Sequence, residues 1–215
     1  AGLDQVGDLA KYTPSLSLKD VKLLKPITNP EHIWCLAVNY LEHHKEVESA
    51  GRVQDLPKKP AMFARFNDSF VAEGEELWHP GVSEQFDYEG ELAVVIGSRR
   101  TSSGRDVYCK RVPVEQAAEW IFGYTIANDV TARDWQGSDD QWARAKGSDT
   151  FLPLGPWINT HWSIEEAEHL GIETRVNDEV RQSGQTSQMV RGIAELVSYV
   201  SGFTTLLPGD LILTG

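Results

Sequence analysis

The distribution of apolar and polar positions along the chain predicts a protein built mainly from strands. Short apolar runs cover residues 33–38, 61–66, 88–97 and 122–128, and β-branched residues are concentrated in the second half of 88–97. A fifth apolar run, 211–215, closes the sequence. Runs of this length, bounded by turn residues, are typical of strands that are buried in a sheet.

Helical spacing is confined to a few segments. Residues 40–50 are polar and end before a glycine, 114–120 follow a proline, and 192–203 carry apolar side chains on one helical face. The dipeptide Asn177-Asp178, inside 172–181, is a hairpin signal. Because strands and helices do not alternate regularly, the pattern disfavours a doubly wound parallel sheet and predicts a β-rich α+β fold.

Composition and charge narrow the range of partners. The 215 residues are 40% hydrophobic and 24% charged, which is ordinary for a globular protein and excludes a disordered or fibrous chain. Acidic residues outnumber basic ones by 32 to 20, for a formal net charge of −12. This charge repels phosphate backbones, so we expect no nucleic-acid partner. A small anionic substrate in a local cationic pocket stays compatible with it, and divalent cations are attracted.

The compartment and the chain ends can also be addressed from the sequence. Two cysteines, Cys35 and Cys109, exclude a disulfide-rich secreted scaffold. No apolar run is long enough for a bilayer and no basic-then-apolar leader opens the chain, so we expect a cytoplasmic protein without a membrane partner. The sequence starts at Ala1 and stops within an apolar strand at Gly215, and we expect missing segments at one or both ends.

Carboxylates form the most informative chemical pattern. Glu89 and Glu91 are two residues apart in a predicted strand, so they point to one side of it. Such a pair is stable next to a hard divalent cation, which prefers oxygen ligands. Spacing alone favours a solvated strand face with Gly90 as a bulge. Asp129 ends the next strand along the chain, where it fits either a ligand at the sheet rim or a turn residue.

Candidate bases and cations lie elsewhere in the chain. His43 and Glu46 share one face of the predicted helix 40–50, where a carboxylate can raise the basicity of a histidine. Their polar neighbours make a plain surface helix the simpler interpretation. Lys146 could stabilise an oxyanion, although a solvated loop charge is favoured from sequence alone. Arg65, inside an apolar strand, indicates either a buried anion partner or a snorkelling side chain.

Taken in order, these segments resemble the fumarylacetoacetate hydrolase family, over about residues 24–215. The resemblance rests on six segments, none of which is specific alone: Cys35-Leu-Ala-Val-Asn-Tyr40 with His43 and Glu46; Pro60-Ala-Met-Phe-Ala-Arg65; Asp87-Tyr-Glu-Gly-Glu-Leu92; Gly123-Tyr124 through Asn128-Asp129 with Arg133, Asp134 and Gln136; Lys146 with Leu154-Gly-Pro156; and Leu207-Pro-Gly-Asp-Leu-Ile-Leu-Thr-Gly215. Where this sequence has Arg65, the family usually has lysine.

The resemblance implies a domain organisation and a set of site residues. Residues 1–24 would be an N-terminal segment, and 25–215 a catalytic domain with a mixed β-sandwich roll, truncated at its C-terminus and assembled as a homodimer. The implied roles are Mg²⁺ or Mn²⁺ ligation by Glu89, Glu91 and Asp129, catalysis by His43, Glu46 and Lys146, and substrate binding by Arg65, Arg133, Gln136 and Thr214.

The resemblance also implies a reaction. The leading expectation is metal-dependent C–C bond hydrolysis of an acylpyruvate, a 2,4-dioxo acid such as fumarylpyruvate, through a metal-bound enolate and water activated by the histidine–glutamate dyad. Oxaloacetate decarboxylation, or isomerisation of a hydroxymuconate-type diacid, would use the same site. A catalytically silent binding protein on the same fold is the alternative from another class.

Overall fold

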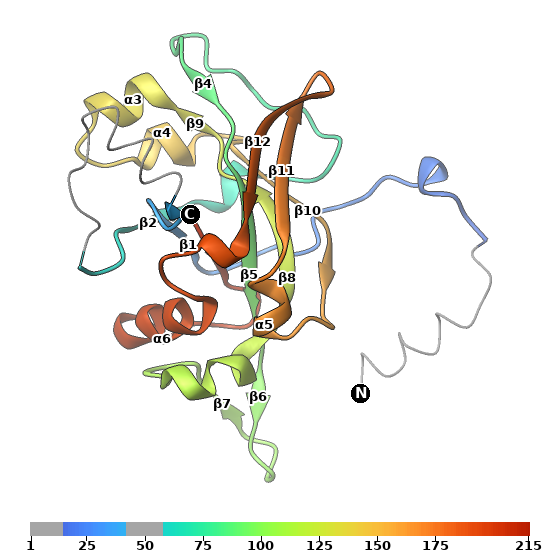
Figure 1. Cartoon of the computed structure of the whole chain (residues 1–215). Helices are drawn as coiled ribbons and strands as arrows, with labels where there is room; N and C mark the ends of the chain where they lie inside the picture. The colour runs from blue at the N-terminus through green and yellow to red at the C-terminus, as the bar shows by residue number, and fades with distance from the viewer. Residues whose placement is uncertain (1–14, 42–57) are drawn as a thin grey trace.

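A curled, seven-stranded mixed sheet forms the centre of the computed structural model, which describes residues 15–41 and 58–215 (Figure 1). The strand order is β2 (Met62–Arg65), β1 (Ile33–Leu36), β13 (Leu211–Leu213), β5 (Gly90–Ile96), β8 (Ile121–Asn128), β10 (Leu152–Asn159) and β3 (Phe70–Val71). The β1–β13 and β10–β3 pairs are parallel, whereas the other neighbours are antiparallel. This topology confirms the predicted β-rich α+β class.

Both faces of the sheet are covered by apolar side chains, which explains the near-continuous apolar run in β5. Leu92 and Val94 alternate with Ala93 and Val95 along this strand, and the two pairs enter different hydrophobic clusters. The first cluster is completed by α6 (Ile193–Phe203) and the 3-10 helix η3 (Val114–Trp120). The second cluster consists mainly of strand residues, among them Cys35 and Leu213. The strand predicted over residues 88–97 is thus observed as β5, which starts two residues later, at Gly90, and ends at Ile96.

The two helices that the sequence predicts in the described part of the chain both form. Helix α6 begins one residue after Gly192, and it buries the apolar face that its spacing indicates: Ile193, Leu196, Val197 and Val200. The segment 114–120 is helical as expected, but it has the tighter 3-10 geometry. The predicted helix 40–50 lies largely outside the described residues.

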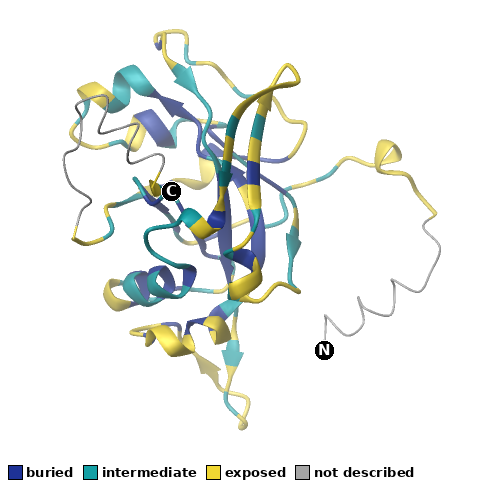
Figure 2. Cartoon of the chain, in the orientation of Figure 1, coloured by how far each residue is buried: buried dark blue, intermediate teal, exposed yellow. Residues whose placement is uncertain are grey.

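The predicted hairpin is formed by β11 (Gly171–Val176) and β12 (Glu179–Gln185). Asn177 and Asp178 turn the chain with positive φ angles of 51° and 66°, the geometry of a two-residue hairpin loop. The distal part of the hairpin is exposed (Figure 2), whereas Ile172 near its base joins the core beside β5.

Smaller elements surround one end of the sheet. The pair β4 (Phe86–Asp87) and β9 (Thr131–Ala132) precedes α3 (Arg133–Ser138) and α4 (Ala143–Gly147), which extend from that end (Figure 1). The remaining elements are the β6 (Arg99–Arg100) and β7 (Asp106–Val107) hairpin, α5 (Ile164–Ala167), and the 3-10 helices η1 (Leu18–Asp20), η2 (Asn67–Ser69) and η4 (Thr186–Gln188). Within the described residues, no helix is long and apolar enough to cross a bilayer.

Candidate metal centre

Three carboxylates meet where β5 begins and β8 ends. Because the two strands are antiparallel with Gly90 opposite Asn128, Glu89 and Glu91 flank the position at which Asp129 leaves the sheet. The backbone N–H of Asp129 donates to the carbonyl of Glu89 at 2.7 Å. One carboxylate oxygen from each of the three acids lies within 4.8 Å of the others. The sheet register therefore gathers the three acids that the sequence analysis singled out.

Burial distinguishes this cluster from an acidic surface patch. Glu91 is 3% exposed and Asp129 is fully buried, so the alternatives of a solvated strand face and a simple turn residue are wrong. Burial raises the pKa of Glu91 well above its ordinary value, and the charges of Asp129 and Glu89 raise it further. Gly90 is not a bulge, since it pairs in register with Asn128. A cluster of this kind requires a compensating cation.

Lys146 is one such cation. It comes from the short helix α4 and is 2% exposed, with its Nζ 2.7 Å from Oε2 of Glu89 and 2.5 Å from Oδ2 of Asp129. Burial alone would lower the pKa of Lys146, but the carboxylates of Glu89 and Asp129 outweigh it and raise the pKa. The interpretation of Lys146 as a solvated loop charge is therefore wrong, because the fold carries it into the interior.

Arg65, the last residue of β2, contacts the Asp129 carboxylate through Oδ1, the oxygen that Lys146 does not bind. Its side chain is fully buried and forms an ion pair with Asp129. Its guanidinium also donates to the backbone carbonyls of Lys146, Val130 and Phe151, the last two at 2.8 and 3.2 Å. The snorkelling alternative is thus wrong, and the buried anion partner is Asp129. Arg65 is held by protein groups, while its contact with substrate stays a prediction.

Arg133, the first residue of α3, approaches the outer edge of the cluster. Its Nη1 lies 2.5 Å from Oε1 of Glu89, and its Nε lies 2.8 Å from Oδ2 of Asp87. The same Nη1 donates to Oε1 of Gln136 at 3.1 Å. Burial opposes ionisation of Arg133, but the carboxylates of Glu89 and Asp87 raise its pKa. Sequence reasoning missed Asp87, although its spacing of two residues from Glu89 was a usable signal.

The two residues that follow β13 contact Glu91 and the strand that carries it. Thr214 is buried, and its hydroxyl contacts the carbonyl of Leu92 at 3.1 Å and the phenol of Tyr40 at 3.2 Å. The backbone N–H of Gly215 donates to Oε2 of Glu91 at 2.7 Å. Burial raises the pKa of Tyr40 to about 12, so this phenol stays protonated. Thr214 therefore lies next to the cluster, and its contact with substrate stays a prediction.

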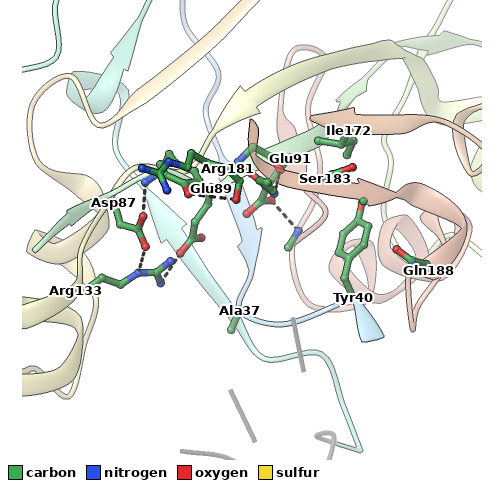
Figure 3. A pocket seen from close by; sticks show the side chains of 15 residues that line it. Ala37, Tyr40, Asp87, Glu89, Glu91, Arg133, Ile172, Arg181, Ser183 and Gln188 are labelled. Atoms are coloured by element: carbon green, nitrogen blue, oxygen red, sulfur yellow. Dashed lines mark hydrogen bonds and ion pairs between the residues drawn. The ribbon is translucent and has the colours of Figure 1, made fainter. Parts of the chain in front are cut away.

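A cavity of about 420 Å³ opens beside the cluster, and Asp129, Lys146, Arg65 and Thr214 are not among its lining residues (Figure 3). Its walls include Glu89, Glu91 and Arg133 from the predicted set, together with Tyr40. The β11–β12 hairpin contributes further lining residues that sequence reasoning missed: Ile172, Arg181, Gln182, Ser183 and Gly184. The hairpin itself was predictable, but no local pattern indicates that it packs over the carboxylates. His43 and Glu46 lie outside the described residues, so their roles stay predictions.

The donor set fits a hard divalent cation. All three acids offer oxygen ligands, and their mutual repulsion inside the protein is relieved when a dication is bound between them. Glu89, Glu91 and Asp129 would hold such an ion, with Lys146 next to it. Nitrogen and sulfur ligands, which softer metals prefer, do not occur in this three-residue group.

Comparisons with known proteins identify the family of this chain. The family model described as fumarylacetoacetate (FAA) hydrolase C-terminal matches residues 32–215. The human protein named oxaloacetate tautomerase FAHD2A, mitochondrial, is 40% identical over 209 residues, which are 96% of this chain and 62% of that protein.

Two solved structures show the same architecture. The 5-carboxymethyl-2-hydroxymuconate delta-isomerase from Mycobacterium smegmatis matches with a TM-score of 0.78 and 41% identity, over 95% of this chain and 74% of that one. A fumarylacetoacetate hydrolase from Exiguobacterium antarcticum matches with a TM-score of 0.73 and 36% identity, over 95% and 71% of the two chains. The chain therefore belongs to the fumarylacetoacetate hydrolase family, and the buried acidic cluster lies within the domain that defines the match.

Proposed function

We propose that this chain is a divalent-metal-dependent enzyme that acts on a small 2-oxo acid, with Mg²⁺ or Mn²⁺ held by Glu89, Glu91 and Asp129. The observation that carries the proposal is the convergence of these carboxylates beside a cavity lined by Arg133. The first candidate reaction is proton transfer next to the oxo group, as in tautomerisation or isomerisation. The names of two relatives, an oxaloacetate tautomerase and a hydroxymuconate delta-isomerase, support this choice.

The charge of the site supports an anionic substrate. Within the cluster, the four carboxylates of Asp87, Glu89, Glu91 and Asp129 outnumber the three cationic side chains, Lys146, Arg65 and Arg133, by one. Binding of a divalent cation turns the formal excess from negative to positive. A substrate carboxylate is then the group that restores neutrality, which favours a keto acid over a neutral ketone.

Different side chains would stabilise charge, bind the substrate and transfer the proton. When bound, the metal would supply Lewis acidity toward a substrate oxygen. Lys146, buried beside Asp129, would stabilise negative charge that develops at that oxygen. Arg133, on the cavity wall, would attract the carboxylate of the substrate. Proton transfer is proposed for His43, with Glu46 as its orienting partner, on the basis of their sequence spacing.

C–C bond hydrolysis of an acylpyruvate such as fumarylpyruvate is the second candidate. It is supported by the spacing of His43 and Glu46, which suits activation of water, and by the name of the hydrolase relative. Oxaloacetate decarboxylation would require the same acidic cluster without an attacking water. A homodimer and a cytoplasmic location are also retained as proposals, although the human relative is named a mitochondrial protein.

A substrate panel with separate readouts distinguishes these reactions. The protein would be supplied with Mg²⁺ or Mn²⁺ and offered oxaloacetate, acylpyruvates, fumarylpyruvate and a hydroxymuconate-type diacid. Loss of the enol absorbance without pyruvate or carbon dioxide indicates tautomerisation, carbon dioxide indicates decarboxylation, and two carboxylic acid products indicate hydrolysis.

Substitutions link any turnover to the acidic cluster. Asp129→Asn and Glu89→Gln should abolish metal-dependent turnover, whereas Glu115→Gln, at an exposed position on η3, should leave it unchanged. Full activity of both site variants would exclude the proposed metal site. An absence of turnover on every substrate, with Mn²⁺ bound, would favour the catalytically silent binding protein.

A further inference from the structure

The β11–β12 hairpin contacts the backbone between the two glutamates. The side-chain amide of Gln182 accepts from the N–H of Gly90 at 2.8 Å, and it donates to the carbonyl of Gly90, also at 2.8 Å. Both backbone groups of this residue are thus bound by one side chain, in the manner of a partner strand. Gly90 links Glu89 to Glu91, so its position sets the separation of the two carboxylates.

The orientation of the Gln182 amide is itself fixed. The hydroxyl of Thr174, on the neighbouring strand β11, donates to the same Oε1 at 2.7 Å. An oxygen that accepts from both Thr174 and Gly90 leaves the amide NH₂ directed at the Gly90 carbonyl. A reversed amide would place its NH₂ group against the Gly90 N–H and its oxygen against the Gly90 carbonyl.

The close packing of the hairpin explains the glycine between the two acids. A Cβ atom at position 90 would collide with Oγ1 of Thr174 and would lie 3.0 Å from Oε1 of Gln182. A glycine at such a point allows another element to approach the backbone. The hairpin therefore approaches the backbone of the acidic strand closely at Gly90.

We propose that Gln182 is a positioning residue for the metal centre, which it serves by holding the Gly90 backbone and thereby the spacing of Glu89 and Glu91. This inference rests on the proposed metal site. Side chains that orient metal ligands from outside the ligand shell commonly contribute about 10- to 100-fold in metal affinity. Gln182 differs from such residues in acting through the backbone between two ligands, not on a ligand side chain.

The test is Mn²⁺ binding to the full chain, measured by calorimetry or by the electron paramagnetic resonance of free Mn²⁺. Gln182→Met keeps the length of the side chain and removes both hydrogen bonds to Gly90. We expect its Mn²⁺ dissociation constant to rise about tenfold. Gln116→Met, at an exposed position on η3, is the matched control and should bind Mn²⁺ as the wild-type protein does.

Two further measurements separate a failure of the inference about Gln182 from misfolding of the variant. In the metal-free proteins, the Gly90 amide should exchange with solvent faster in Gln182→Met than in the control. If Gln182→Met does not fold, Thr174→Val, which removes only the orienting hydroxyl, should weaken Mn²⁺ binding in the same direction. Unchanged Mn²⁺ affinity in a folded Gln182→Met or Thr174→Val protein overturns the inference about Gln182. Failure of the wild-type protein to bind Mn²⁺ overturns the proposed function instead.

Discussion

The ammonium nitrogen of Lys146 lies 2.5 Å from Oδ2 of Asp129, inside a part of the fold where both side chains are almost completely buried. The pair joins α4 to the end of β8, 17 residues apart in sequence. Removing one member of a buried ion pair leaves the other charge without compensation. The resulting loss of stability is much larger than the net stabilisation by the intact pair. The stability of the metal-free protein should therefore depend on Lys146.

Lys146→Met should lower the free energy of unfolding of the metal-free protein by about 3 kcal/mol. Saturating Mn²⁺ should recover much of this loss, because a bound dication replaces the missing positive charge beside Asp129 and Glu89. Urea unfolding with and without Mn²⁺ measures both effects. Lys110→Met, at an exposed position, is the control. An equal loss of stability with and without Mn²⁺ would contradict a shared role for the ion and the lysine.

Arg65→Lys should lower the free energy of unfolding by about 1–3 kcal/mol, although the charge is kept. One ammonium group cannot reach the carbonyls of Lys146, Val130 and Phe151 in the geometry of the planar guanidinium. Chemical denaturation measures the loss, with the exposed Arg105→Lys as the matched control. Wild-type stability in Arg65→Lys would show that the buried carbonyls find other donors.

Glu91 gives the stability of the metal-free protein a definite dependence on pH. Its pKa is raised in the folded state by burial and by Asp129 and Glu89, so the folded protein retains a proton that the unfolded chain releases. The contribution of Glu91 to folding is therefore unfavourable above the unfolded pKa of about 4.3, and the stability falls as the pH rises from there toward the raised folded pKa.

Glu91→Gln should remove the unfavourable contribution that Glu91 makes to folding. The metal-free variant should therefore be more stable than the wild-type protein at neutral pH. The free energy of unfolding measured across the range from acidic to neutral pH provides the test. Mn²⁺ affinity should show the opposite trend in the wild-type protein and increase with pH, because the ion competes with the proton on Glu91. Parallel stability profiles for the two proteins would show that Glu91 does not titrate abnormally.

Asp178→Gly should stabilise the β11–β12 hairpin. Asp178 adopts a φ angle of 66° in a two-residue turn, and asparagine followed by glycine is the preferred sequence for that geometry. We expect the free energy of unfolding to rise by about 0.5 kcal/mol. The Mn²⁺ affinity should be unchanged, because the turn residues do not line the cavity. Thermal unfolding and Mn²⁺ titration check the two expectations, and a decrease in stability would contradict the assigned turn.

Much of the architecture could be predicted from the sequence because it depends on local patterns. The apolar runs of β1, β5 and β8, the helical spacing of α6 and the Asn177-Asp178 turn each determine an element within a few residues. The carboxylates could also be identified, since Glu89 and Glu91 share a strand face and Asp129 ends the next strand along the chain. These features require only neighbours in sequence, so they do not depend on the packing of the whole chain.

The environment of the site was decided only by the tertiary structure. Spacing favoured a solvated Lys146, a surface pair at Glu89 and Glu91, and left Arg65 ambiguous, because burial and charge pairing depend on segments that are far apart in the sequence. The antiparallel register of β5 and β8 brings Asp129 to the glutamates, and α4 places Lys146 between Glu89 and Asp129. The β11–β12 hairpin forms one wall of the cavity. A side chain becomes a buried counter-ion only when packing removes the water around it, and no local pattern encodes that step.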